Sequence, residues 1–259
     1  LGEIWGYVSD GYYTIDDFVL DDAKRDVWTL KEGVTSIQGV KVQPGDEKFK
    51  DFDGDGVISS GAGTVSDPGD RKIIGNNRAR FQFGANIGAT YKGFSLDVRL
   101  QGVGKRDYWL SGSSIFPFAG SGSADAVFQP LFSNQTDYWT AKSYDPENSD
   151  YMVAKNPNAK LFRIYDQGNN VGSNTRVSDK YLQNAAYLRV KNITLGYTLP
   201  RHWVKHVLME SARIYVSVEN LGTISNLPKG YDPEGNTNNA IVWDYPYYRT
   251  ISIGANITF

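Results

Sequence analysis

The sequence predicts an all-β protein built from antiparallel strands that are long enough to cross a membrane, and three observations support this fold class. The last segment, 251–259, alternates apolar and polar residues without a break, as a strand with two different faces does. The same alternation recurs over 80–91 and 94–103, each near the ~9–11 residues that a membrane-crossing strand needs. No stretch approaches the ~18 apolar residues of a membrane-spanning helix.

The first predicted element is an aromatic-rich, extended stretch at 4–13, which we interpret as a strand. A loop region, 15–79, follows it and is acidic at its start and rich in Gly and Asp later. Two strands are then predicted at 79–92 and 94–109. A tight turn at Lys92 and Gly93 joins them, and in both strands apolar residues alternate with polar residues or Gly.

The middle of the chain repeats this arrangement of loop and strand. Residues 110–183 form a loop region rich in Ser, Gly and Asn, and the strand at 186–199 that follows ends at Pro200. Within this strand the apolar residues change from even to odd positions. The change predicts a β-bulge near Lys191 and Asn192.

Three further elements complete the chain. A short helical segment at 201–209 precedes an alternating strand from Ala212 to Glu219. A third loop, 221–245, leads to a final strand that begins near Tyr247. The sequence therefore predicts about six strands, in which short connections alternate with long loops.

Brief turns on one side and long loops on the other are typical of outer-membrane β-barrels, whose long loops are extracellular. About six strands do not enclose a ligand pathway, because eight strands already give an interior that side chains fill. An open sheet also has two bare edges that aggregate. We therefore expect residues 1–259 to be the carboxyl-terminal part of a larger transmembrane barrel.

The composition is compatible with this fold and excludes several classes of function. The formal net charge of −2 and the lack of a run of Lys and Arg give no reason to expect nucleic acid as a partner. The chain has no Cys, which excludes disulfides and thiol chemistry within it. The mean hydropathy of −0.43 fits a barrel, because only alternate side chains face lipid.

Several stretches form an ordered set that is more specific than any one of its members. They are Gly6-Tyr7 with Asp10-Gly11-Tyr12, Asp51 to Ile58, Asp70 to Asn76, Phe83 to Gly104, Asn156 to Lys160, Tyr187 to Pro200, Tyr215 to Ser217 with Glu219 to Leu221, Gly230 to Glu234, and Arg249 to Phe259. In this order they resemble the carboxyl-terminal region of the SusC/RagA-type TonB-dependent outer-membrane transporters. The resemblance covers nearly the whole chain.

The resemblance implies a barrel of about 22 strands with an amino-terminal plug, powered through TonB, in the outer membrane of a Gram-negative bacterium. It implies import of oligosaccharides or peptides beneath a SusD-like lipoprotein lid. The plug, the TonB-contacting segment and the earlier strands then lie outside residues 1–259. The terminal Ser252, Gly254, Ile257 and Phe259 look like the signal that the barrel-assembly machinery reads. The alternative is an edge strand that happens to end in Phe.

Residues 51–57 match the start of a calcium-binding loop, in which carboxylates at alternate positions converge on one cation and a Gly permits the sharp turn. Ala62 stands where such a loop usually has its bidentate Glu, but after an insertion of Gly, Ser and Ala either Asp67 or Asp70 could close the site from further away. The expected calcium ligands are Asp51, Asp53, Asp55, the backbone of Val57, and Asp70. The alternative is a turn held by its own side-chain-to-backbone hydrogen bonds.

Aromatic residues are numerous in the predicted loops, and in the resembling family such loops line the ligand chamber. Exposed rings suit sugar C–H surfaces or peptide side chains, so the candidates for ligand contact are Trp109, Tyr138, Trp139, Tyr144, Trp243 and Tyr245. The alternative is that these rings pack the loops together or against the lid. Arg80, Asp97 and Arg99 face the predicted lumen, where they pair with one another or with the plug, or touch solute.

No catalytic site is expected. His202 and His206, the only histidines, lie in a predicted periplasmic turn opposite the long loops, so no hydrolase triad can be assembled. Their spacing, with Glu210, is compatible with zinc, but the segment resembles a basic helix that varies within the family. No pair of loop carboxylates stands out as a glycosidase pair.

Two classes of function therefore compete. The first is a transporter segment that provides barrel wall and extracellular loops, contacts lipid, ligand and lid, and requires no cofactor apart from the candidate calcium. The second is a secreted, calcium-dependent β-sandwich that binds carbohydrate through its loop aromatics. Strand length and the terminal Phe259 favour the first. A passive porin is a closer competitor, and only the missing amino-terminal region distinguishes it.

Overall fold

The computed structural model describes residues 2–21, 28–112, 115–117, 131–165, 171–235 and 247–259, without the side chains of 171 and 172. These residues form two compact units. The loop unit comprises Leu1–Asn76 and Trp109–Leu182 in their described parts. The sheet unit comprises Asn77–Tyr108, Gln183–Asn236 and Ile241–Phe259, likewise in their described parts.

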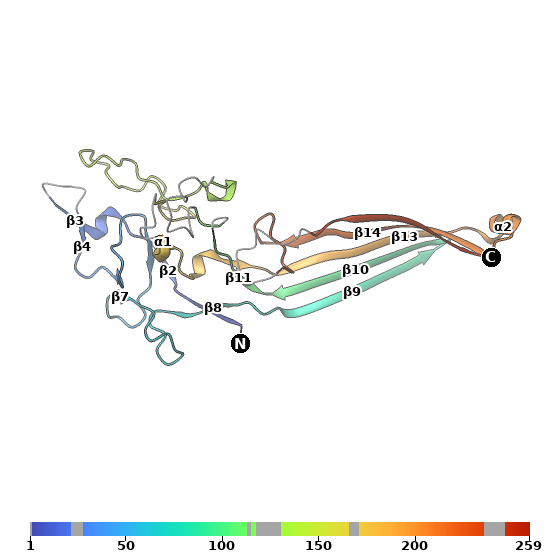
Figure 1. Ribbon diagram of the computed structural model, residues 1–259, viewed down its shortest axis with the longest axis horizontal. Coiled ribbons are helices and arrows are strands. Elements are labelled where there is room, and N and C mark those ends of the chain that lie inside the picture. Colours follow the sequence, from blue (N-terminus) through green and yellow to red (C-terminus); the bar gives the residue numbers. More distant parts are fainter. Residues whose placement is uncertain (1, 22–27, 113–114, 118–130, 166–170, 236–246) are drawn as a thin grey trace. The chain divides into compact units, whose positions relative to one another are not determined.

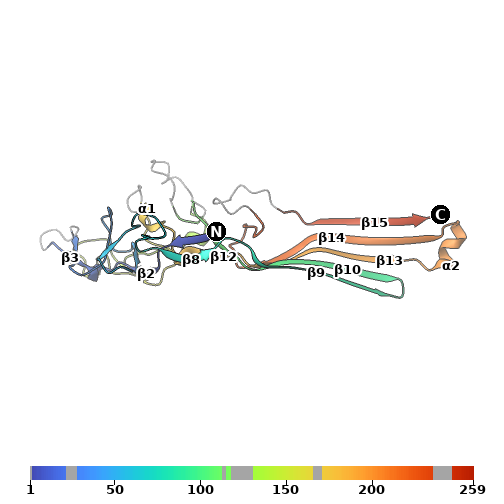
Figure 2. The ribbon, with the colours of Figure 1, turned by 90° about the horizontal axis from the view of Figure 1, so that it is seen from below.

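The sheet unit is one antiparallel sheet of five long strands, in the order β15-β14-β13-β10-β9, and the strands lie side by side in Figures 1 and 2. The strands are β9 (Arg80–Tyr91), β10 (Phe94–Lys105), β13 (Tyr187–Thr198), β14 (Ser211–Ser225) and β15 (Thr250–Thr258). Each of the five was predicted from its alternation. Two short strands, β11 (Asp107–Trp109) and β12 (Leu182–Asn184), lie where the chain passes between the units.

The register of the sheet places apolar residues opposite apolar residues. Leu96 of β10 lies opposite Ala89 of β9 and Leu195 of β13, and the same match continues across β14 and β15. The apolar side chains of this face are exposed; Ile87 of β9, for example, is 56% exposed and Ile253 of β15 is 83% exposed. A contiguous apolar face of this size is foreign to a soluble surface and is what a lipid-facing barrel wall presents.

The opposite face of the sheet is polar and is held by hydrogen bonds between strands. Arg99 Nε donates to Asn86 Oδ1 at 3.2 Å, and Asn192 Nδ2 donates to Ser217 Oγ at 2.9 Å. The register shifts at Lys191, which has no opposite residue in β10. This confirms the predicted β-bulge and explains why the apolar residues change from even to odd positions there.

Gly254 of β15 provides the room for an aromatic ring on the neighbouring strand. Tyr215 is its direct partner in β14, and a Cβ on Gly254 would lie 2.4 Å from Cζ of that ring. Any larger residue therefore displaces the ring. This gives the glycine of the predicted assembly signal a packing role of its own.

Gly254→Ala is expected to reduce the folded fraction of the full-length receptor in outer membranes, because overpacking costs about 1–3 kcal/mol. Adding Tyr215→Ser should restore the folded fraction, since the ring that clashes is then gone. Heat-modifiable mobility on gels measures both. If the double variant stays as defective as Gly254→Ala alone, the glycine is read by the assembly machinery rather than required by Tyr215.

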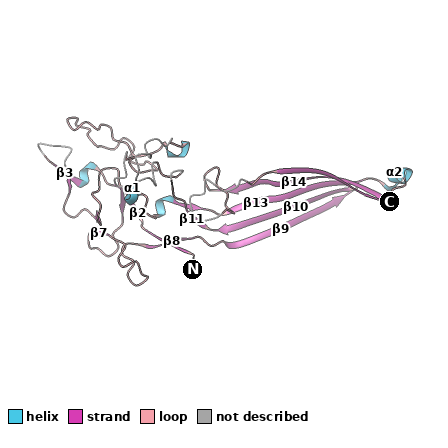
Figure 3. Ribbon diagram, viewed as in Figure 1, coloured by secondary structure: helices cyan, strands magenta, loops and turns pink. Residues whose placement is uncertain are grey.

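The loop unit is built from short two-stranded pairs rather than long strands, as the extent of loop in Figure 3 shows. The pairs are β1 (Glu3–Gly6) with β8 (Lys72–Asn76), β2 (Ser9–Tyr12) with β6 (Glu47–Phe49), β3 (Phe18–Leu20) with β4 (Trp28–Leu30), and β5 (Ser36–Ile37) with β7 (Val57–Ile58). Its helical turns are η1 (Ile15–Asp17), η3 (Ser133–Gln135), α1 (Val171–Asn174) and η4 (Asp179–Tyr181).

The predicted first strand, 4–13, is not a member of the five-stranded sheet. It forms β1 and β2, which pair with β8 and β6. Its aromatic residues explain the difference, because Tyr7 and Tyr13 are buried in a core with Phe49 and further residues of the loop unit. A lipid-facing strand would leave those rings exposed. The sheet therefore has five strands rather than about six.

A short helical connection joins β13 to β14. It consists of α2 (Arg201–Val204) and the turn η5 (Lys205–Val207), and it confirms the helical segment predicted at 201–209. Figure 1 shows α2 beyond the strand ends, at the end of the sheet that also carries the carboxyl terminus. Among the described residues, no helix is long and apolar enough to cross a membrane.

Candidate functional site

The predicted calcium loop brings three carboxylates together. One oxygen from each of Asp51, Asp53 and Asp70 lies within 4.8 Å of the others. In the part of the chain that the structure describes, this is the only group of three or more acidic, His or Cys side chains so placed, and neither histidine of α2 and η5 belongs to it. Three carboxylate oxygens at this separation fit a hard cation such as Ca²⁺.

Backbone N–H groups orient these carboxylates. Asp51 accepts hydrogen bonds from the N–H groups of Gly54 and Gly56 at 2.6 and 2.8 Å, and these bonds hold its pKa below the ordinary value. Although the N–H of Asp55 opposes the change, slight desolvation and the surrounding carboxylates raise the pKa of Asp53. The cluster is therefore crowded with negative charge, which a bound cation would relieve.

The structure selects among the predicted calcium ligands. Asp70 is fully buried and accepts from the N–H groups of Phe52 and Ser59, which fixes it beside Asp51 and Asp53. Asp67 instead accepts from the N–H of Ala62 within the inserted turn. Asp55 lies outside the cluster of three and accepts from the N–H of Val57 at 2.7 Å.

The predicted backbone ligand, the carbonyl of Val57, belongs to β7. The carbonyls on either side of it, those of Gly56 and Ile58, accept from the N–H groups of Ser36 and Gln38. Because carbonyls alternate in direction along a strand, that of Val57 points away from β5. Its role as a ligand remains a proposal.

The predicted aromatic ligand contacts separate into different environments. Trp139 is 1% exposed and packs in a core with Ala141, Tyr151, Met152 and Ala159, so its ring is part of the loop-unit interior. This corrects its prediction as a ligand-contacting ring. The sequence cannot distinguish an aromatic residue that packs loops from one that faces ligand, because both occur in segments without periodicity.

Three of the other predicted rings are at least partly exposed, and two lie outside the described residues. Tyr144 is 53% exposed, and Arg163 lies 5.6 Å from its ring centroid. Tyr138 is half-buried. Trp109 is half-buried and its ring centroid lies 5.9 Å from that of Phe116. Trp243 and Tyr245 lie outside the described residues.

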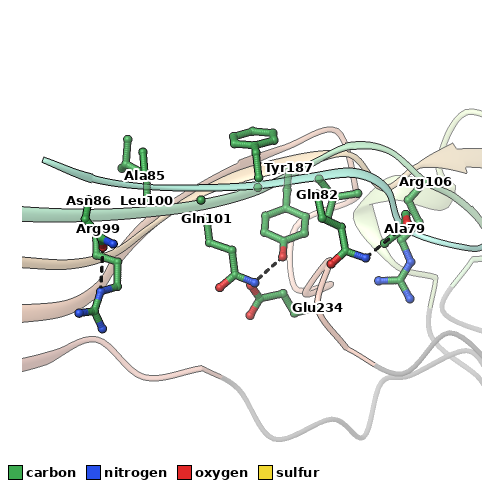
Figure 4. A pocket seen from close by; sticks show the side chains of 14 residues that line it. Ala79, Gln82, Ala85, Asn86, Arg99, Leu100, Gln101, Arg106, Tyr187 and Glu234 are labelled. Atoms are coloured by element: carbon green, nitrogen blue, oxygen red, sulfur yellow. Dashed lines mark hydrogen bonds between the residues drawn. The ribbon is translucent and has the colours of Figure 1, made fainter.

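A cavity of about 700 Å³ lies on the sheet unit near the ends of β9, β10 and β13. Figure 4 shows its polar side chains, among them Gln82, Asn86, Arg99 and Gln101, on one side of the strands, whereas Leu100 points to the other. The lining carries amide donors and acceptors together with cationic groups. Such a surface can hydrogen-bond the hydroxyls of a sugar or the amides of a peptide.

One wall of this cavity is held by a network of ion pairs, which we call the Arg189 lock. Arg189 is 2% exposed and binds Asp232 at 2.5 Å and Glu234 at 2.7 Å. Lys191 Nζ and the hydroxyl of Tyr187 also donate to Glu234, at 2.6 and 2.8 Å. Although burial opposes ionisation, these donors hold the pKa of Glu234 below its ordinary value.

The lock fastens residues 230–235 to the polar face of the sheet. Arg106 adds a hydrogen bond from Nη1 to the carbonyl of Pro233 at 3.0 Å, and Tyr108 donates to the same carbonyl. The sequence alone did not predict this network. Its available signal was the Asp-Pro-Glu turn of residues 232–234 together with basic residues beside the bulge in β13. No sequence pattern indicates that this turn contacts those basic residues.

The lumen-facing charges that the sequence singled out do not pair with one another among the described residues. Arg99 donates to Asn86 of the neighbouring strand, as described above. Asp97 lines a smaller cavity of about 150 Å³ together with Arg99 and Asn192. Arg80 lies at the start of β9 and is exposed. No ion pair among Arg80, Asp97 and Arg99 occurs within 4.0 Å in the described part of the chain.

No family model matches the chain, but individual proteins do. The chain is 28% identical over 274 residues to TonB-dependent receptor P3 of Formosa agariphila. The aligned region covers 100% of this chain and 22% of that protein. The chain is 26% identical over 215 residues to TonB-dependent receptor SusC of Bacteroides thetaiotaomicron, covering 83% of this chain and 18% of that one. The chain therefore spans about a fifth of the length of these relatives.

Solved structures share the fold. The structure of the RagAB peptide transporter matches 99% of this chain and 23% of that chain, with a TM-score of 0.54 and 20% identity. The RagAB peptide importer in the open-open state matches 99% and 22%, with a TM-score of 0.51 and 17% identity. At this level of identity the likeness concerns the fold.

Proposed function

Since the chain is a segment of a SusC/RagA-type TonB-dependent receptor, we propose that it forms part of the wall and outer loops of an importer in a bacterial outer membrane. The exposed apolar face of the five-stranded sheet carries this proposal. Apolar side chains exposed along every strand have a favourable environment only in lipid, because in water they would drive aggregation. The polar face then lines the lumen.

The solute that we propose is an oligosaccharide or a peptide. The cavity on the polar face supports this choice, because its amides and cationic groups can hydrogen-bond an uncharged polar chain. The relatives of known structure are described as peptide importers. Among the loop aromatics, Trp109, Tyr138 and Tyr144 keep enough exposure to contact solute or lid. Trp243 and Tyr245 stay candidates from sequence alone.

The proposed partners follow from the receptor class. A SusD-like lipoprotein lid would cover the outer loops, TonB would act through a region outside residues 1–259, and the barrel-assembly machinery would read the last strand. The segment itself performs no chemistry in this proposal. Its residues orient solute and separate lipid from the lumen.

Import is tested in the native host with labelled oligosaccharides and peptides. Deletion of the gene for the full-length receptor is expected to abolish uptake of one solute class. Collapse of the inner-membrane proton gradient should abolish it as well, because TonB transmits that energy. Uptake that persists without the gradient would identify a passive porin, and recovery of the intact protein from the secreted soluble fraction would overturn the membrane assignment.

The alternative of a secreted β-sandwich is disfavoured by the same sheet. In a sandwich the apolar side chains of one sheet pack against a second sheet about 10 Å away. Here, no other sheet of the described residues has more than two strands. The apolar face of the sheet unit stays exposed.

We further propose that Asp51, Asp53 and Asp70 bind calcium, with the Val57 carbonyl and Asp55 as further candidate ligands. Calcium is expected to raise the melting temperature of the full-length receptor, because an ion that binds only the folded state stabilises it. Asp53→Asn should remove the shift, since Asp53 contributes one carboxylate to the cluster and accepts a backbone hydrogen bond from the N–H of Asp55. The measurement is thermal unfolding with calcium or with chelator.

Asp67→Asn is the matched control for calcium binding. Asp67 is also an acidic residue of this loop that accepts a backbone N–H, but it is not in the cluster. It should keep the calcium-dependent shift. Equal shifts in Asp53→Asn and the unaltered receptor would show that the three carboxylates form only a hydrogen-bonded turn.

A further inference from the structure

The connection between β13 and β14 exposes apolar side chains that the sheet does not use. Trp203 is 57% exposed, Val207 is 56% and Leu208 is 87%. Val204 is 3% exposed and faces inward, so the segment is a folded turn with an inner and an outer side. The outer side therefore includes three exposed apolar side chains at a strand connection, where polar residues are usual.

The backbone at Leu208 makes this exposure more unusual. Its φ is 58°, in the left-handed region, where a helix end normally has Gly or Asn. A leucine here gives up backbone freedom and also places its side chain outside the protein. Neither property is favourable in water. The exposure is explained when the side chain enters an apolar phase, whereas the steric cost of the backbone conformation is the same in either phase.

The same segment is basic. Arg201 and Lys205 are exposed, His202 and His206 lie between and beside them, and Glu210 is its only acidic residue. Cations with tryptophan and aliphatic side chains are the composition of segments that lie in a membrane interface. An anionic surface complements this charge.

The adjoining turn of the sheet has the same character. Thr198 N–H donates to the carbonyl of Gly93 at 2.8 Å, which places the β9–β10 turn beside the end of β13. Tyr91 is 70% exposed, and the rings of Phe94 and Tyr197 meet with centroids 4.5 Å apart. Aromatic residues at strand ends mark the level of lipid headgroups. The connection is therefore continuous with the lipid-facing side of the sheet.

We propose that residues 201–208 form a lipid-headgroup anchor, in which Trp203, Val207 and Leu208 enter the inner leaflet and Arg201 and Lys205 bind anionic phospholipid headgroups. The proposal rests on the proposed membrane insertion of the sheet. It assigns the partner by chemistry, since phosphate oxygens accept from Arg and Lys while apolar side chains reach the acyl boundary.

The test uses the full-length receptor in nanodiscs that contain either brominated phosphatidylglycerol or brominated phosphatidylcholine at the same low fraction. The fluorescence of the unaltered receptor minus that of Trp203→Phe isolates the emission of Trp203. This emission is expected to be quenched by both lipids and more strongly by phosphatidylglycerol. Charge reversal in Arg201→Glu/Lys205→Glu should remove the preference, which we expect to be about fivefold for each cation.

Lys160→Glu is the control, because Lys160 is an exposed cation of the loop unit and should leave the preference unchanged. Equal quenching by the two lipids would overturn the anionic headgroup assignment, and absence of quenching in an inserted, transport-competent receptor would overturn the anchor while leaving import intact. Failure of the receptor to insert into nanodiscs at all would overturn both the anchor and the proposed function.

Discussion

Replacing Arg189 with methionine is expected to release residues 230–235 from the sheet and to cost about 3–5 kcal/mol of local stability. The reason is that Arg189 is buried at 2% exposure and neutralises both Asp232 and Glu234. Without it, Glu234 keeps Lys191 and Tyr187 as donors, whereas Asp232 keeps the N–H of Glu234. Trypsin cleavage at the exposed Lys229 of the folded full-length receptor measures the release, and cleavage should become much faster.

The exposed pair of Lys142 and Asp150 is the matched control for the Arg189 lock. Lys142 Nζ lies 3.7 Å from Asp150 Oδ1, and the two side chains are 49% and 54% exposed. Lys142→Ala should therefore lower the free energy of unfolding by only about 0–1 kcal/mol. Proteolysis at Lys229 should not change in this variant. If Arg189→Met resists trypsin as well as the unaltered receptor does, other contacts hold the segment, and the lock has no mechanical role.

Ile87→Arg is expected to cost about 2–4 kcal/mol and to lower the folded fraction in outer membranes, because it places a charge against hydrocarbon. Ile87 is 56% exposed on the apolar face of β9. In a water-soluble protein the same change at an exposed position would be nearly neutral. The size of the loss in folded fraction therefore distinguishes a lipid-facing wall from a soluble sheet.

Asn86→Arg is the control for Ile87→Arg at the same depth. Asn86 is adjacent in sequence but lies on the polar face, where it pairs with Arg99. A new cation there meets water, although it loses the hydrogen bond from Arg99 and gains one like charge, so the expected cost is about 1 kcal/mol. Heat-modifiable mobility and the amount of receptor in the outer membrane measure both variants. Equal loss in the two would contradict the assignment of the faces.

Periodicity made the sheet predictable. The alternation over β9 and β10 and at the carboxyl terminus identified strands, faces and length, and the change of parity identified the bulge at Lys191. These are local properties, because a pleated backbone places successive side chains on opposite faces wherever the strand lies. The stretch at 4–13 shows the limit, since its aromatic residues are compatible with a strand in either unit.

The sequence by itself determined that this chain has an apolar and a polar side on each long strand, and that acidic residues recur near Asp51. Only the tertiary structure decided that Asp55 lies outside the cluster of Asp51, Asp53 and Asp70, that Trp139 is core, and that Arg189 holds Asp232 and Glu234. The reason is physical. Strand faces follow from the geometry of neighbouring residues, whereas ion pairs and burial depend on which distant segments meet, and no local pattern encodes that meeting.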